Sequence, residues 1–97
     1  MAPETTTFTH VKNGVTFLVT VHGWAPNYGF IIKANYEGVQ LFTLHHKYRF
    51  IYYPTSRQPL IEIAEDAFKA DLAIEMYNLA ERTAFRLKED LYKPFPL

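Results

Sequence analysis

The dipeptide Asn13-Gly14 constrains this chain more than any other feature, because it lies between two strand-like runs, 8–12 and 15–22. Both central residues of a two-residue hairpin turn need positive φ, and Asn and Gly tolerate that conformation best. Since side chains alternate along a strand, one apolar face follows for the second run. The predicted pairs are Lys12 with Val15, His10 with Phe17, and Phe8 with Val19, and the predicted face holds Val15, Phe17, Val19 and Val21.

A second hairpin is predicted at Glu37-Gly38, where it would join residues 30–36 to residues 39–45. Between the two hairpins, residues 23–29 contain two glycines, a proline and an asparagine, which predicts a loop. After the second hairpin two readings are open. Either His46-Lys47 turns the chain into a fifth strand over 48–53, or the fourth strand is long and bent. Residues 54–59 read as a connector.

Residues 60–91 predict a helix, because they are rich in Ala, Leu, Glu and Lys and contain no Gly or Pro. Pro94 then ends it. At 100° per residue, the early and late polar positions fall on nearly opposite sides, so the apolar stripe changes face near Ala70. Either the helix breaks there, or one straight helix packs on the sheet with its first half and offers its second half elsewhere.

These elements predict one α+β domain over residues 1–97, with β-rich hairpins in 1–58 and helix in 59–97. The sheet would be a four- or five-stranded antiparallel meander, covered on one face by the long C-terminal helix, continuous or kinked near residue 70. Apolar residues make up 48% of the 97, enough for one modest core.

Catalytic and metal chemistry find no support in the residue types. The chain has no cysteine, and Ser56 is its one serine, without the glycines of a nucleophile elbow. The adjacent His45 and His46 would point to opposite sides of a strand and could not easily share a metal ion. We therefore expect no catalytic residue, no metal and no cofactor.

Charge and hydropathy limit the partners. The net charge is zero, yet residues 1–58 carry +3 and residues 59–97 carry −3, so we expect a dipolar molecule. A dedicated nucleic-acid binder would usually carry a basic excess, so direct nucleic-acid binding is not the first expectation. No apolar run is long enough to span a bilayer and the start of the chain lacks a leader pattern, which predicts a cytoplasmic protein.

Residues 45–57 interleave cations with aromatic rings and form the most distinctive stretch. Tyr and Arg are enriched in protein-interface hot spots, which makes a partner-binding surface the leading reading. A plain amphipathic strand and a single-stranded nucleic-acid platform are the alternatives, the latter ranked last because of the zero net charge. The candidate residues are Lys47, Tyr48, Arg49, Tyr53 and Arg57.

The late helix offers a second candidate surface with heptad spacing. Its stripe is made of Ala73, Tyr77, Ala80, Ala84, Leu87 and Leu91. Such stripes usually pack against the chain's own sheet. The alternative is a docking face for a partner, or for a second copy in a homo-oligomer. The partner-binding candidates on this face are Tyr77, Ala84, Leu87 and Leu91.

The Thr-rich start, the aromatic hairpins and the long acidic helix together resemble the small accessory proteins with which phages inhibit or redirect host enzymes. The chain is most similar to the anti-RecBCD proteins of P22-like phages. The resemblance implies a non-enzymatic modulator that binds the RecC subunit of the host nuclease-helicase RecBCD and alters its activity in DNA recombination. It also implies that the protein works in the cytoplasm of a bacterial host.

Overall fold

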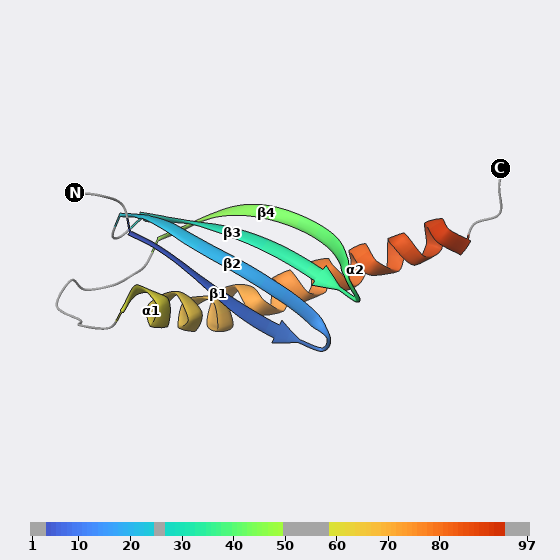
Figure 1. Cartoon of the computed structure of the whole chain (residues 1–97), viewed down its shortest axis with the longest axis horizontal. Coiled ribbons are helices and arrows are strands. Elements are labelled where there is room, and N and C mark those ends of the chain that lie inside the picture. The colour runs from blue at the N-terminus through green and yellow to red at the C-terminus, as the bar shows by residue number, and fades with distance from the viewer. Residues whose placement is uncertain (1–3, 25–26, 50–58, 93–97) are drawn as a thin grey trace.

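The computed structural model describes residues 4–24, 27–49 and 59–92, with side-chain surroundings up to Leu87. Four strands form one antiparallel sheet in the order of the chain, and a long helix follows (Figure 1). The strands are β1 (Glu4–Lys12), β2 (Val15–Trp24), β3 (Asn27–Tyr36) and β4 (Val39–Arg49), and the helical segments are α1 (Leu60–Ala67), the π-helical turn η1 (Phe68–Leu72) and α2 (Ala73–Tyr92). The predicted α+β class and the meander are confirmed.

Both predicted hairpin turns are present. Asn13 and Gly14 have φ values of 49° and 82°, and Glu37 and Gly38 have values of 50° and 79°. Positive φ at both central residues is the conformation that joins two strands with their right-handed twist preserved. The predicted first-hairpin register is confirmed, since Lys12 pairs with Val15 and the alignment continues along both strands.

Two sequence expectations about the strands need correction. The predicted loop over 23–29 is shorter, because Gly23 pairs with Tyr28 and Trp24 with Asn27. The predicted turn at His46-Lys47 is wrong: β4 runs through both residues to Arg49, as the alternative of a long fourth strand proposed. The pairing of β3 with β4 shifts register between Ala34 and Asn35, so β4 is irregular at this point. The rest of the proposed fifth strand lies outside the described residues.

The helix covers one face of the sheet, and the core lies between them (Figure 1). Phe68 is fully buried at the centre of this layer, with its ring centroid 5.8 Å from that of Phe8 and 5.8 Å from that of Phe17. From the sheet, alternate residues of β2 and β3 point toward the helix. The fully buried ones among them are Phe17, Val19, Val21, Phe30, Ile32 and Ala34.

The change of apolar face near Ala70 is accommodated by an irregular turn in the helix. Residues 68–72 form a π-helical turn, which holds one more residue than an α-helical turn. An extra residue rotates everything after it by about 100°. The late stripe is thereby turned back onto the same sheet, and Ala73, Met76 and Ala80 are buried there. The helix therefore neither stops at Ala70 nor offers its second half wholly elsewhere.

No helix within the described segments is long and apolar enough to cross a membrane.

Candidate protein-binding groove

The C-terminal part of α2 extends past the sheet. Ala80 is the last fully buried residue of α2 whose surroundings are described, and Ala84, one turn later, is half-buried. Figure 1 shows the red end of the helix running beyond the tips of both hairpins. Two large apolar side chains lie on this extension, Phe85 with 63% and Leu87 with 39% of its surface exposed. This segment carries apolar surface that the chain's own sheet does not cover.

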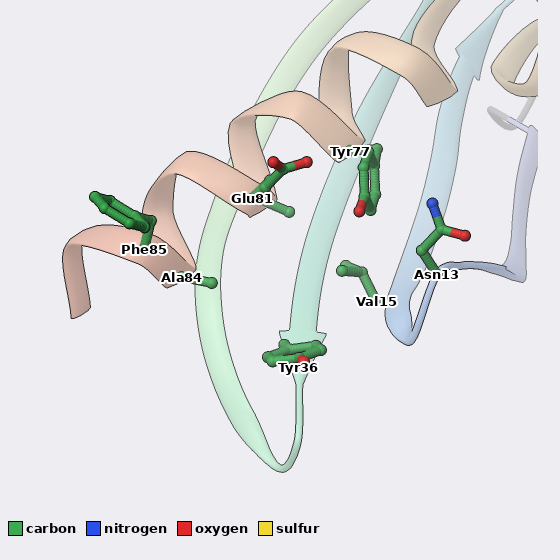
Figure 2. A pocket seen from close by; sticks show the side chains of 8 residues that line it. Asn13, Val15, Tyr36, Tyr77, Glu81, Ala84 and Phe85 are labelled. Carbon is green, nitrogen blue, oxygen red and sulfur yellow. The ribbon is translucent and has the colours of Figure 1, made fainter. Parts of the chain in front are cut away.

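A groove lies where the helix leaves the sheet, with a cavity volume of about 210 Å³. One wall comes from the hairpin end of the sheet and the other from α2, as Figure 2 shows. Tyr77 points from the helix toward Val15, while Tyr36 lies across the end of β3. The lining residues are Asn13, Val15, Tyr36, Tyr77, Ala80, Glu81, Ala84 and Phe85. One of the eight, Glu81, carries a charge.

The two hairpin turns shape the sheet wall of this groove. Gly14 has no side chain, and a Cβ atom there would lie 3.4 Å from the ring of Tyr36. The Tyr36 ring therefore lies beside the first turn, within ordinary contact distance of a side chain at position 14. On the helix side, the Lys12 ammonium lies 5.7 Å from the centroid of the Tyr77 ring, within cation–π range. Tyr77 is thus placed between the end of β1 and the helix.

A second hollow runs along the outer part of α2. It is lined by Glu81, Arg82, Phe85 and Arg86, and shares Glu81 and Phe85 with the groove. The exposed Phe85 ring therefore lies between an apolar groove and two guanidinium groups. Aromatic and Arg side chains are the types that are enriched where proteins bind one another.

The predicted helix surface is thus partly located. Tyr77 and Ala84 line the groove, and Leu87 lies on the extension one turn beyond. Leu91 belongs to α2, but its side chain lies outside the described residues. The expectation that this stripe packs against the chain's own sheet is confirmed for part of it, because Ala73 and Ala80 lie in the core.

The cation–aromatic stretch is divided by the sheet. Lys47 and Arg49 are exposed on the face away from the helix, whereas Tyr48 points to the helix side and packs against the core. The Tyr48 hydroxyl donates a hydrogen bond to the Asp71 carboxylate. This bond, followed by burial and the negative charge of Asp71, raises the pKa of Tyr48 to about 12. Tyr53 and Arg57 lie outside the described residues.

The two predicted surfaces do not meet. Tyr77 lies near the hairpin tips, where β4 begins, and Arg49 is the last residue of β4. At about 3.3 Å per residue, the 11-residue strand separates them by roughly 30 Å. Lys47 and Arg49 also lie on the face of the sheet opposite to Tyr77, whereas Tyr48 lies on the same side as Tyr77.

Sequence reasoning missed Phe85 and Tyr36 as site residues. Phe85 lies outside the heptad stripe, and its exposure depends on where the sheet ends, which no local pattern reveals. A usable signal existed for Tyr36, since it shares its predicted strand face with Ala34 and Ile32 and closes that face beside the second turn.

Histidine and carboxylate groups form no metal site in the part of the chain that the structure describes: no group of three or more is placed to hold an ion there. His45 and His46 do point to opposite faces of β4, as predicted, with His45 exposed and His46 half-buried.

Comparisons with protein-family models, with curated protein sequences and with solved structures found no match.

Proposed function

We propose that this chain is a non-enzymatic protein-binding modulator that grips its partner with the groove and the extended end of α2. The observation that carries the proposal is the placement of Phe85, a large aromatic side chain with 63% of its surface exposed beside an apolar groove. Burial of such a ring against a partner is worth about 1.5–3 kcal/mol from its apolar surface.

The surroundings of Phe85 support this reading. The groove offers two tyrosine rings, Tyr36 on the sheet wall and Tyr77 on the helix wall. Arg82 and Arg86 flank the ring and can form hydrogen bonds with carbonyl or carboxylate groups of a partner. A rigid aromatic centre with a polar rim is the usual anatomy of a protein interface.

The resemblance to phage anti-RecBCD proteins makes RecC the first partner to test. In this proposal the protein is encoded by a phage, acts in the cytoplasm of the bacterial host, and alters the nuclease-helicase activity of RecBCD by binding.

The direct test measures binding of the purified chain to purified RecBCD by calorimetry. Phe85→Ala should weaken binding by about 1–3 kcal/mol, because a central aromatic contact is lost. Its melting temperature should change little, since the ring is mostly exposed in the free protein. Ile74→Ala is the matched control: Ile74 is 62% exposed, lies on the same helix and does not line the groove.

Two failures are distinguishable. Absence of binding to RecBCD would reject RecC as the partner while leaving the surface untested against other proteins. Binding that is equally strong in the parent, Phe85→Ala and Ile74→Ala proteins would reject the groove as the binding surface.

A further inference from the structure

The helix covers one face of the sheet, and no element among residues 4–24, 27–49 and 59–92 covers the other face (Figure 1). We call this surface the open face. Strand alternation and register assign its members, which share an orientation away from the core. They include threonines at 5, 7, 9, 16, 20 and 43, together with His22, Trp24, Asn27, Ile31, Lys33, His45, Lys47 and Arg49.

Charge on the open face has one sign. Its ionised side chains are Lys33, Lys47 and Arg49, all of them exposed. Within the described strands the one carboxylate is that of Glu4, which alternation places on the helix side. Burial raises the pKa of Tyr28 there, and the negative charge of Glu4 and its hydrogen bond raise it further. The acidic side chains of α1, η1 and α2 lie on the other side of the sheet.

Two of these cations, Lys47 and Arg49, lie at the end of the sheet where β2 connects to β3, whereas Lys33 lies nearer the other end of β3. A hollow of about 590 Å³ lies at this end of the sheet and reaches both of its faces. From the open face it is lined by His22, Asn27, Gly29, Lys47 and Arg49, and from the helix side by Gly23, Tyr28 and Tyr48. Gly29 makes room for the His22 ring, because a Cβ at this position would lie 3.0 Å from Nε2. On the next strand, β4, Lys47 pairs with Gly29 and Arg49 pairs with Asn27.

Ring surface lies next to this hollow. Trp24 pairs with Asn27 and has 57% of its side chain exposed. Trp24, Asn27 and Arg49 therefore form a row across the three neighbouring strands β2, β3 and β4 on one face of the sheet. A ring beside cations on an open antiparallel sheet is the arrangement on which nucleotide bases stack while their phosphates are neutralised.

We propose that the open face binds single-stranded nucleic acid, with Lys33, Lys47 and Arg49 on the phosphates and Trp24 and His22 under the bases. The zero net charge of the chain does not oppose this, because the negative side chains belong to the helical side. This activity is independent of the groove, which lies on the other face at the other end of β4.

The test is fluorescence anisotropy with a short fluorescein-labelled oligothymidylate at low salt. Three phosphate contacts predict a slope of log K against log salt concentration of about −2 for a single strand. Arg49→Glu and Lys47→Glu should each lower affinity by tenfold or more. Arg82→Glu on α2 makes the same change in net charge away from the open face, and should leave affinity within about twofold.

Trp24→Ala should lower affinity roughly five- to hundredfold while leaving the salt slope unchanged, because stacking is lost and the phosphate contacts remain. Phe85→Ala should bind the oligonucleotide like the parent, which keeps this result separate from the groove experiment.

Three results would overturn the proposal. The first is no anisotropy change at roughly 100 µM protein, the weak end of non-specific nucleic-acid affinities. The second is an equal effect of Arg82→Glu and Arg49→Glu, which would indicate attraction by net charge alone. The third is loss of RecBCD binding in Arg49→Glu without any oligonucleotide binding by the parent, which would make the open face a protein interface.

Discussion

His10 is a titratable residue packed against aromatic rings of the core. It lies on the core side of β1, half-buried, with its ring 5.3 Å from that of Phe68 and 6.3 Å from that of Phe17. Burial lowers the pKa of His10, and the positive charges of Lys69 and Lys12 lower it further, while Glu65 opposes them. The fold therefore prefers the neutral imidazole.

This preference makes stability depend on pH. In the unfolded chain the histidine has a pKa of about 6.5, and in the folded chain a lower one. The stabilising contribution is present above pH 6.5 and is lost as pH falls through the folded pKa, because the unfolded chain takes up the proton first. Urea midpoints measured from pH 8 to pH 5 should fall.

His10→Gln should flatten the acid side of that profile, since the titrating group is gone. His45→Gln, on the open face, serves as the control and should keep the parent's slope. An unchanged slope in His10→Gln would show that other groups cause the acid loss.

Tyr48 ties the edge strand to the helix, because its hydroxyl bonds to Asp71 in the π turn. We expect Tyr48→Phe to lower the free energy of unfolding by about 1 kcal/mol, the usual net value of one hydrogen bond. A double-mutant cycle with Asp71→Ala isolates the bond, and a coupling energy near zero would contradict its role.

The raised pKa of Tyr48 gives a second readout of the same bond. The contribution is complete below pH 10 and is lost as pH rises through the folded pKa of about 12. Tyr48→Phe should therefore lose less stability than the parent between these values.

At the scale of elements, the π turn decides which face of α2 meets the sheet. Ala70 is exposed within it, so its deletion removes the extra residue without removing a core side chain. An uninterrupted α-helix would then still present Met76 and Ala80 to the sheet, because the deletion removes the one residue by which the π turn offsets the later helix. We therefore expect the free energy of unfolding to change by no more than about 1 kcal/mol.

Ala70→Ser is the control for this deletion, because it keeps the length and costs only about 0.5 kcal/mol in helix propensity. Thermal melting followed by circular dichroism compares the two. A deletion protein less stable than Ala70→Ser by about 2–5 kcal/mol, as for a large core truncation, would contradict the role of Ala70 as the extra residue of the turn.

The elements that depend on local chemistry were predictable from the sequence. The turns at Asn13-Gly14 and Glu37-Gly38 could be predicted because few residues accept positive φ, and each turn then fixes the register of its strands. The change of face near Ala70 was visible too. Its resolution by a π turn was not, because that depends on how much stability burying Met76 and Ala80 on the sheet contributes, a quantity of the packed molecule.

The candidate sites were predictable only in part for a related reason. Tyr77 and Ala84 followed from helical periodicity. Tyr48 was grouped with Lys47 and Arg49 as neighbours in sequence, and strand alternation places it on the opposite side. Phe85 became visible only once the length of the sheet relative to the helix was known.

On the scale of the whole molecule, charge is sorted by layer. The described strands carry the cations of the open face, and the helical layer carries six of the described acidic side chains, from Glu62 to Glu81. A net charge of zero is therefore an average over two unlike surfaces, and each face presents its own field to a partner.

Because the four strands precede the helix in the chain, the sheet is synthesised on the ribosome before the helix. The apolar side of the sheet therefore stays exposed to water while the residues from Arg49 to Leu87 are synthesised. At 5–20 residues per second this takes roughly two to eight seconds. During that interval the nascent chain presents Phe17, Phe30 and their neighbours to chaperones, and to other nascent chains, before its own helix arrives.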